Sequence, residues 1–509
     1  MLPVRGGPGQ TGAHGCSAVP HSAPVETGTG GGDSEHAGAA LLPEGFHFGV
    51  ATAGYQIEGG YNGPGEPANN WCRWEAEGRV EPSGSAIGFW ERYEEYLDLA
   101  AGLGCDSFRM SIEWARAEPE DGALDEAAID GYRRILDACR ARGMMPLVTL
   151  HHFTHPAWLG EDFWLGSDAP DRFAGWVRTA VDAFGDLCAN WITTNELNVL
   201  ALESFVTGTF PPGRLGRVRT AATALDHLVT AHVLAYDVIH DLQPHAVVGT
   251  NNYCLSIYEF DRLPLDLLLA RPNGISRPDL GRWLQARRQE HESTTPGPQG
   301  LHRPLEAALR ALAARTVPAD RALPRATQAV YESPRHRHLD VAQVDFYAPG
   351  AADHLRCPGR RTAGGRTFNP ARDLWDDRPD PTRLTQALHE VADGDLKVWL
   401  VENGMCNRVR HGRSYTRLDG WTRDRYLREH LAAVVDAIDQ GVPVNGYWHW
   451  TLADNYEWGS YQPRFGLYHI DRDRGLVIGR CDAMGVDAAG TYRRVIAGLR
   501  RGDRSVLVS

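Results

Sequence analysis

Two glutamates in this chain have the surroundings that acid–base or nucleophilic chemistry needs. Glu196 lies in the segment WITTNELN at residues 191–198, and Glu402 lies in VWLVENG at residues 398–404. Each belongs to a run of β-branched or apolar residues, which is typical of a buried strand. Two carboxyl groups at the ends of different strands can cleave a glycosidic bond, one as proton donor and the other as nucleophile or as the base that activates water.

The elements that must position these glutamates alternate along the chain. Short apolar runs predict strands, and most of them are separated by amphipathic stretches of helical length. The expected strands cover residues 46–51, 106–112, 145–150, 190–194, 246–251, 341–347, 397–401 and 443–450. The expected helices include residues 126–142, 172–184, 222–242, 383–392 and 423–440. This alternation predicts an α/β fold, a (β/α)8 TIM barrel whose C-terminal strand ends carry the chemistry.

We expect a single barrel domain over residues 41–509, with loop insertions. Residues 1–40 are rich in Gly and poor in large apolar side chains, which predicts a disordered N-terminal tail. Residues 255–339 are rich in Arg, Pro and His and follow the alternating pattern poorly. They predict an irregular insert of loop and helix beside the site.

Composition and charge exclude several kinds of partner. The chain has 509 residues and a net charge of −13, whereas nucleic acids and anionic membranes bind basic surfaces. We find no run of about 18 apolar residues that would predict a membrane span, and no apolar core of a signal peptide. Nine cysteines without a C-x-x-C pair fit reduced thiols in a cytoplasmic protein. The oligomeric state is left open.

Six motifs in a fixed order give the chain its resemblance to a known family. They lie at residues 46–59, 108–114, 150–153, 195–196 and 402–404, and in a final loop at residues 447–458 with 464–467. On these motifs, the chain resembles glycoside hydrolase family 1, the β-glucosidase-like retaining glycosidases, over roughly residues 43–500. The resemblance implies an enzyme with a TIM barrel and a small-molecule β-glycoside substrate.

The resemblance also implies a role for each residue near the two glutamates. Glu402 matches the nucleophile of the family and Glu196 its general acid/base, which together give net retention at the anomeric carbon. Arg109 and Tyr347 match residues that keep the nucleophile ionised and oriented. Asn195 matches the group that hydrogen-bonds the 2-hydroxyl of the sugar. Retention requires the two carboxyl groups to lie about 5–5.5 Å apart.

A second set of residues matches the subsite that holds the sugar. It comprises the polar groups Gln56, His152, Glu457 and Trp458, the stacking platform Trp450 and the wall residue Phe465. Outside its motif, each residue would be interpreted as an aromatic side chain of the core or as a polar group whose hydrogen bonds are already made. Their places in the motifs favour substrate binding, most of all for Gln56, Trp450 and Glu457.

The residue at position 457 bears on the kind of sugar that is bound. Family members that take 6-phosphosugars have a small residue there and a lysine for the phosphate. Glu457 would repel a phosphate, and the only lysine of the chain, Lys397, precedes the seventh strand. We therefore expect a non-phosphorylated β-glycoside, and we expect no cofactor.

Three closely spaced histidines raise the possibility of a metal site. His151, His152 and His155 do not have the spacing of a helical zinc motif, and Phe153 and Pro156 interrupt them. The family that the chain resembles uses no metal. We expect none here.

Three departures from the family pattern fall around the predicted reaction centre. Leu197 replaces a proline and adds an N–H group that needs a partner. Asp345 replaces an asparagine, and an ionised carboxylate there would raise the pKa of its neighbours. Thr154 and His155 replace the usual pair before Pro156. These changes predict slow or pH-shifted turnover, or an unusual aglycone.

Three functions remain open from the sequence. The leading hypothesis is a retaining β-glycosidase, with β-glucosidase as first choice, acting by a double displacement on two glutamates. The second is a barrel recruited to tailoring or non-hydrolytic chemistry on a natural product, because the departures cluster at the centre. The third is a catalytically impaired sugar-binding protein, and the presence of both carboxyl groups counts against it.

Overall fold

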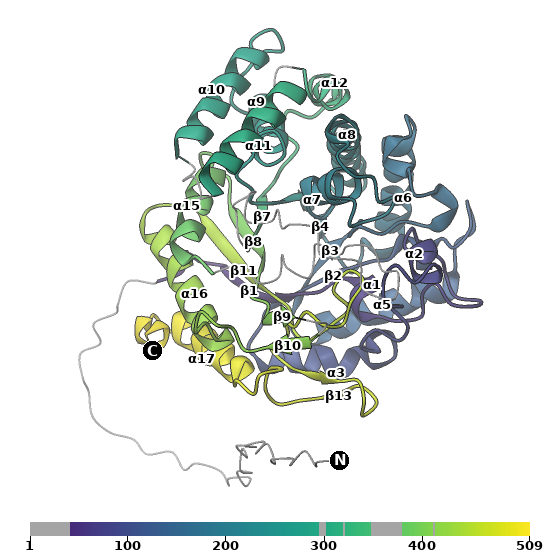
Figure 1. Cartoon of the computed structure of the whole chain (residues 1–509), viewed down its shortest axis with the longest axis vertical. Helices are drawn as coiled ribbons and strands as arrows, with labels where there is room; N and C mark the ends of the chain where they lie inside the picture. Colours follow the sequence, from purple (N-terminus) through teal and green to yellow (C-terminus); the bar gives the residue numbers. More distant parts are fainter. Residues whose placement is uncertain (1–40, 295–301, 319–320, 348–378, 411–412, 509) are drawn as a thin grey trace, which may run out of the picture. The chain divides into compact units, whose positions relative to one another are not determined.

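Parallel strands form a closed barrel in the computed structural model. They are β1 (His47–Ala51), β2 (Ser107–Ser111), β3 (Met145–Thr149), β4 (Asn190–Ile192), β5 (Val247–Gly249), β6 (Asn251–Tyr253), β7 (Ala342–Phe346), β8 (Val398–Asn403) and β11 (Val444–Trp450). The order in the sheet is β5-β4-β3-β2-β1-β11-β8-β7-β6. β5 and β6 are two halves of one strand interrupted at Thr250; β5 pairs with β4 and β6 pairs with β7. The sheet therefore closes on itself, which confirms the predicted (β/α)8 barrel (Figure 1).

The structure describes residues 41–294, 302–318, 321–347, 379–410 and 413–508. The tail predicted to be disordered, residues 1–40, lies outside the described residues. By its internal contacts, the chain from Ala40 to Ser509 forms one unit.

Amphipathic helices form the outer layer around the strands. In α5 (Glu126–Ala141), Ile129, Tyr132 and Leu136 lie on one buried face, at the spacing of a helix stripe. Asp125 begins this helix by accepting hydrogen bonds from two backbone N–H groups of its first turn. The layer also includes α3 (Phe89–Gly102), α6 (Ala169–Phe184), α8 (Val218–Leu242), α15 (Pro381–Val391), α16 (Arg423–Asp439) and α17 (Ala488–Arg500). Among the described residues, none of the helices combines the length and apolar character needed to cross a bilayer.

Short elements fill the loops between strands and helices. The short helices are α1 (Gly54–Ile57), α2 (Cys72–Ala76), α4 (Trp114–Ala117), η1 (Ala157–Leu159), η2 (Phe163–Leu165), α7 (Leu197–Leu202), η3 (Glu203–Thr207) and η4 (Arg504–Leu507). Two small antiparallel ladders pair β9 (Arg408–Arg410) with β10 (Arg413–Tyr415) and β12 (Ile470–Asp471) with β13 (Val477–Ile478). Of these elements, α1 and α7 come directly after strands of the barrel and carry residues of the predicted site.

The segment expected to be an irregular insert, residues 255–339, contains four helices in its described part. They are α9 (Arg262–Ala270), α10 (Leu280–Thr294), α11 (His302–Thr316) and α12 (Pro324–Glu332). α12 is fixed to the barrel layer at its N-terminus, where Asp226 of α8 accepts from the backbone N–H groups of Arg325 and Ala326 at 3.2 and 2.9 Å. The segment is therefore more regular than the sequence indicated, because its many Arg residues conceal the helical spacing of the apolar ones.

Side chains fill the interior of the barrel. Gly49 on β1 leaves room for the indole of Trp448 on β11, since a Cβ at Gly49 would lie 2.2 Å from that ring. The indole donates a hydrogen bond to Ser107 Oγ at 3.0 Å. Packing of this kind makes the barrel a solid support for the residues at its strand ends.

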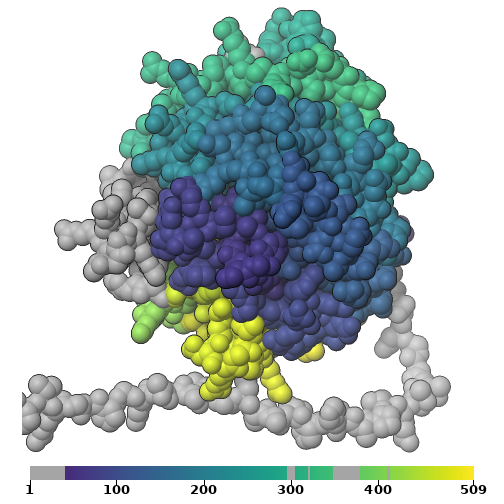
Figure 2. Space-filling view, turned by 90° about the vertical axis from the view of Figure 1, so that its right-hand side faces the viewer, coloured from purple at the N-terminus to yellow at the C-terminus, as the bar shows by residue number. Residues whose placement is uncertain are grey.

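The first and last parts of the barrel meet at the surface. β1 and β11 pair in parallel, and Arg92 of α3 donates to the carbonyl of Leu476 at 2.8 Å. Arg500 of α17 contacts Asp106 just before β2, also at 2.8 Å. Figure 2 shows the early segment in purple beside the C-terminal segment in yellow.

Candidate active site

An irregularity in β8 aims Glu402 into the barrel. The pairing with β7 shifts by one residue just before Asp345 meets Glu402, so β8 carries one extra residue, Val401. A bulge of this kind re-aims the side chain next to it. The Val401 carbonyl accepts a hydrogen bond from Arg109 Nη1 at 3.0 Å. The side chain of Arg109, on β2, therefore stabilises the bulge.

Glu196 follows β4 and is the N-cap residue of α7. Its φ of 39° and ψ of 64° lie in the left-handed region, which costs a residue with a Cβ about 1–2 kcal/mol. Backbone strain of this kind gathers at functional sites. Leu197 is the first residue of α7, a position at which the backbone N–H has no acceptor within a helix whatever the residue. Its substitution for proline is therefore compatible with the local structure.

Arg109 joins the two glutamate segments. Its guanidinium donates to Glu402 Oε1 at 2.5 Å and also to Asn195 Oδ1. Tyr347, just after β7, donates its hydroxyl to the other oxygen of Glu402 at 2.8 Å. Both oxygens of Glu402 thus accept hydrogen bonds, which favour its ionised form. The structure places these four residues of the predicted set in one network.

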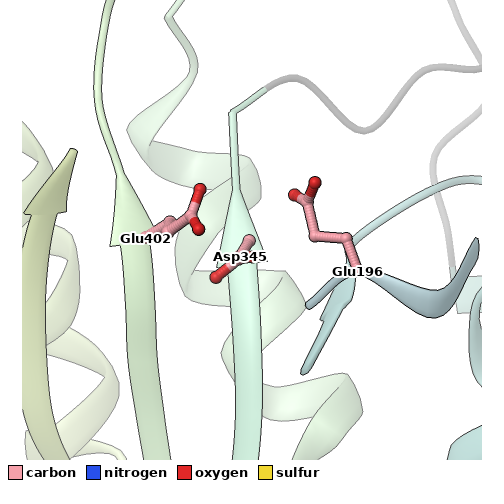
Figure 3. Close-up of side chains that lie close together, drawn as sticks. All are labelled: Glu196, Asp345 and Glu402. Atoms are coloured by element: carbon pink, nitrogen blue, oxygen red, sulfur yellow. The ribbon is translucent and has the colours of Figure 1, made fainter. Parts of the chain in front are cut away.

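Burial and repulsion control the protonation of the carboxyl groups at this centre. Glu196, Asp345 and Glu402 each place one carboxyl oxygen within 4.8 Å of the others (Figure 3). Burial raises the pKa of Glu196, and the charges of Asp345 and Glu402 raise it further. Burial also raises the pKa of Glu402, but Arg109 and the hydroxyl of Tyr347 oppose that effect. Of the three carboxyl groups, Glu402 therefore has the contacts that best stabilise an ionised form, and Glu196 is favoured in its protonated form.

Asn251 belongs to this network but was not predicted from the sequence. Its amide on β6 donates to Asn195 Oδ1 at 2.9 Å and to Asp345. The Asn195 amide in turn lies 3.3 Å from His152 Nε2. The signal that could have identified Asn251 is its place as a polar residue closing the strand expected at 246–251.

A second group of predicted residues surrounds Glu457, in the loop after β11. Gln56 of α1 and the indole of Trp450 each donate to one oxygen of Glu457 at 3.1 Å. Burial raises the pKa of Glu457 to about 8, although these hydrogen bonds lower it. Within the described residues, Gln56 Oε1 and His152 Nδ1 are buried and have no hydrogen-bond partner. Both therefore have hydrogen-bonding capacity that no described residue uses.

The aromatic residues of the predicted set form walls. Trp458 stacks on His152 with 5.6 Å between ring centroids, and it packs against Phe153 at 4.9 Å. Phe465 meets Tyr347 edge-on at 6.1 Å. Trp458, expected to act as a polar group, thus lies in an aromatic cluster, whereas Phe465 lies beside a residue that contacts Glu402.

The third departure from the family pattern makes structural contacts. Thr154 donates its hydroxyl to Glu113 Oε2 at 2.5 Å. The backbone N–H of His155 donates to Asn70 Oδ1 at 3.1 Å, and its ring contacts the carbonyl of Gly160 at 3.0 Å. These residues fix the loop after β3.

Two groups of side chains have the composition of metal ligands. The three histidines each engage a different partner through Nε2, namely Trp164 for His151, Asn195 for His152 and Gly160 for His155. The three carboxyl groups already have a cation beside them, because Arg109 lies 2.5 Å from Glu402 and 4.0 Å from Asp345. Neither arrangement favours a bound metal ion.

A cavity of about 1060 Å³ lies between α9, α10, α15 and α16. Its lining contains none of the predicted site residues. Asp266 in this lining pairs with Arg262 at 2.9 Å and with Arg287 at 3.2 Å. The lining as a whole mixes these two guanidinium groups with five carboxyl groups, and this mixture indicates no ligand class.

Known proteins resemble this chain over most of its length. The 6-phospho-beta-galactosidase 1 of Streptococcus pneumoniae (strain ATCC BAA-255 / R6) is 28% identical, over 84% of this chain and 94% of the relative. The beta-glucosidase of Agrobacterium sp. is also 28% identical, over 85% and 92%. The solved structure of the beta-glucosidase from Thermotoga maritima in complex with deoxynojirimycin superposes with a TM-score of 0.67 at 24% identity, covering 91% of this chain and 99% of that chain.

The match to a family model assigns the chain to a protein family. The model described as Glycosyl hydrolase family 1 matches residues 39–273 and 369–480, which is more than half of the chain. The interval between the two matched parts contains α10, α11, α12 and β7. Asp345 on β7 and Tyr347 just after it therefore lie outside the match. The match includes both glutamates and the residues of the loop after β11. The chain belongs to glycosyl hydrolase family 1.

Proposed function

We propose that this glycoside hydrolase is a retaining β-glycosidase, most simply a β-glucosidase, with Glu402 as nucleophile and Glu196 as general acid/base. The observation that carries the proposal is the approach of carboxyl oxygens of Glu196 and Glu402 to within 4.8 Å. Retaining enzymes have carboxyl groups about 5–5.5 Å apart, whereas inverting enzymes need about 6.5–9.5 Å to admit a water. Direct attack by Glu402 on the anomeric carbon fits the shorter distance.

The charges at the site support this division of roles. Arg109 and Tyr347 bind both oxygens of Glu402 and favour the carboxylate that a nucleophile must be. The charge of Glu402 helps to raise the pKa of Glu196, which keeps the proton for the leaving oxygen. When Glu402 forms the glycosyl ester its charge is lost, so the pKa of Glu196 falls and Glu196 becomes the base that activates water.

The sugar of the substrate is assigned to the space beside Glu457. Gln56 and Glu457 offer an amide and a carboxyl group joined by a 3.1 Å hydrogen bond, and Trp450 adds an apolar ring. Sugars have apolar C–H faces and polar rims, which suits this combination. Asn195, held between Arg109 and Asn251, is assigned to the 2-hydroxyl.

Relatives of this chain include enzymes named for phosphorylated and for non-phosphorylated sugars. Glu457 supports a non-phosphorylated sugar, because a buried carboxyl group supplies no positive charge for a phosphate dianion, and its ionised form, present above a pKa of about 8, repels one. Lys397 is exposed and precedes β8, at the opposite end of the strand from Glu402. Its ammonium group is therefore unavailable to a phosphate at the site.

A panel of nitrophenyl β-glycosides tests the proposed substrate class. We expect release of nitrophenol from the β-glucoside and much weaker or no release from the 6-phospho-β-galactoside. Release from the phosphorylated substrate alone would overturn the assignment of Glu457. Saturable binding of β-glucosides without any release would instead favour a sugar-binding protein, and a glycosylated product without hydrolysis would favour a tailoring enzyme.

A further inference from the structure

We propose that Asp345 is a positioning residue that shares the catalytic proton of Glu196, so that the acid/base group of this enzyme is a pair of carboxyl groups. The inference rests on the proposed function, which assigns the acid/base role to Glu196. It adds a residue that lies in the interval unmatched by the family model.

The position of Asp345 makes it part of the reaction centre. Its side chain is fully buried on β7, and Figure 3 shows it between Glu402 and Glu196. Asp345 Oδ2 accepts a hydrogen bond from the amide of Asn251. The other oxygen, Oδ1, has no hydrogen-bond partner among the described residues. A buried carboxylate oxygen without a donor is costly, and a proton shared with a neighbouring carboxyl group removes that cost.

The charge balance requires a bound proton at this centre. Three ionised carboxyl groups would face one guanidinium, that of Arg109, in a site without solvent contact for Asp345. Like charges at such separations do not all ionise. Glu402 has the nearest contact to Arg109 and the hydroxyl of Tyr347, so the proton resides on Glu196 and Asp345.

The pKa values of Glu196 and Asp345 are both shifted upward, which agrees with a proton shared between them. Burial raises the pKa of Asp345, the charge of Glu402 raises it further, and the charge of Arg109 opposes the rise. Burial raises the pKa of Glu196, and the charge of Asp345 raises it further. The charge of each neighbouring carboxylate thus favours a proton on the pair, whose oxygens lie within 4.8 Å of each other.

Other titratable groups near the pair are held in one form around neutral pH. Burial lowers the pKa of His152 after β3, which keeps its ring neutral. Burial raises the pKa of Tyr347 after β7 and of Cys254 after β6, which keeps both protonated. Arg109 on β2 is the guanidinium that faces Glu402, at 2.5 Å. Glu457, whose pKa burial raises to about 8, also titrates on the basic side, but it is unchanged in the variants, so a difference in the basic limb between wild type and variant should report the pair.

The pair gives up and regains one proton per turnover. In the first step, the bond from the anomeric carbon to the leaving oxygen breaks, a bond to Glu402 forms, and the shared proton moves through Glu196 to the leaving oxygen. In the second step, water attacks the anomeric carbon, the bond to Glu402 breaks, and the proton of water returns to Glu196 and Asp345. No other reactant is required.

The Asp345→Asn variant tests the proposal through the pH dependence of kcat/KM for a nitrophenyl β-glycoside. Asparagine keeps the size of the side chain but removes the negative charge, so Glu196 should lose its proton more easily. We expect the basic limb to move to lower pH by about one unit or more. Coincident basic limbs in the wild type and the variant would overturn the proposal.

A matched control separates this effect from the loss of any buried carboxyl group. Burial raises the pKa of Glu113 to about 7, and its partners are Ser111 and Thr154 rather than Glu196. Glu113→Gln should leave the basic limb in place. A shift equal to that of Asp345→Asn would count against a specific role for Asp345.

Infrared titration of the protonated carboxyl band gives a second measurement that needs no turnover. The wild type should retain a protonated carboxyl signal to higher pH than Asp345→Asn, and identical titrations would contradict proton sharing. Absence of glycoside cleavage by the wild type at every pH would instead refute the proposed function. The two failures are therefore distinguishable.

Discussion

Arg109 is the residue on which most contacts of the site converge. Its guanidinium contacts Glu402, Asn195 and the carbonyl of the bulge residue Val401, and its Nε donates to Thr149 at 3.3 Å. The guanidinium of arginine offers five N–H donors in one plane, whereas the ammonium of lysine offers no planar set. Arginine therefore suits this position. One side chain therefore orients the proposed nucleophile and the proposed 2-hydroxyl ligand together.

The hydroxyl of Tyr347 should control the acidic limb of the pH profile. In Tyr347→Phe, Glu402 loses a donor that lowers its pKa, so that pKa should rise above its value in the wild type. Since the nucleophile must be ionised, the acidic limb of kcat/KM should move to higher pH. A hydrogen bond to a charged group contributes about 1.5–3 kcal/mol, which corresponds to a roughly ten- to hundredfold loss of kcat/KM near neutral pH. An unchanged acidic limb would argue against Glu402 as the nucleophile.

At the level of elements, the sequence predicted the strands better than their details. Apolar runs located the strands of the barrel except β6, most of which lies beyond the strand expected at 246–251, and strand ends located Glu196 and Glu402, because buried parallel strands have a distinct composition. The bulge at Val401 was not predictable, since it depends on register with two neighbouring strands. The role of Asn251 was also missed, because hydrogen bonds between side chains on different strands leave no local pattern.

The N-cap of α5 offers a test of how a single residue begins an element of the outer layer. Asp125 accepts from the N–H groups of Ala127 and Ala128 at 2.9 and 3.1 Å. Asp125→Ala should destabilise the helix by about 1 kcal/mol. We expect a lower Tm and faster hydrogen exchange in the first turn of α5.

The matched control is Asp168, the N-cap residue of α6, whose side chain makes no capping hydrogen bond. Asp168→Ala should have a smaller effect on Tm than Asp125→Ala. Equal effects in both variants would mean that loss of surface charge, and not loss of the cap, lowers the stability.

At the scale of the whole molecule, closure of the barrel brings distant segments to one mouth. Predicted site residues lie near or after the C-terminal ends of β1, β3, β4, β7, β8 and β11, and β2 contributes Arg109 from its middle. The helical segment α9–α12 lies between β6 and β7 along the chain, and most of it falls outside the family match. The sequence could predict the barrel because its strands and helices repeat, but it could not predict this segment, which has no counterpart in that repeat.

Covalent trapping with an activated 2-deoxy-2-fluoro-β-glucoside tests the central assignment most directly. The fluorine slows hydrolysis of the glycosyl-enzyme, so the intermediate accumulates and can be located by mass spectrometry of peptides. We predict one label per chain, on Glu402, and no label in Glu402→Gln. A label on another residue, or turnover through an inverted product without any label, would contradict the proposed pair of glutamates.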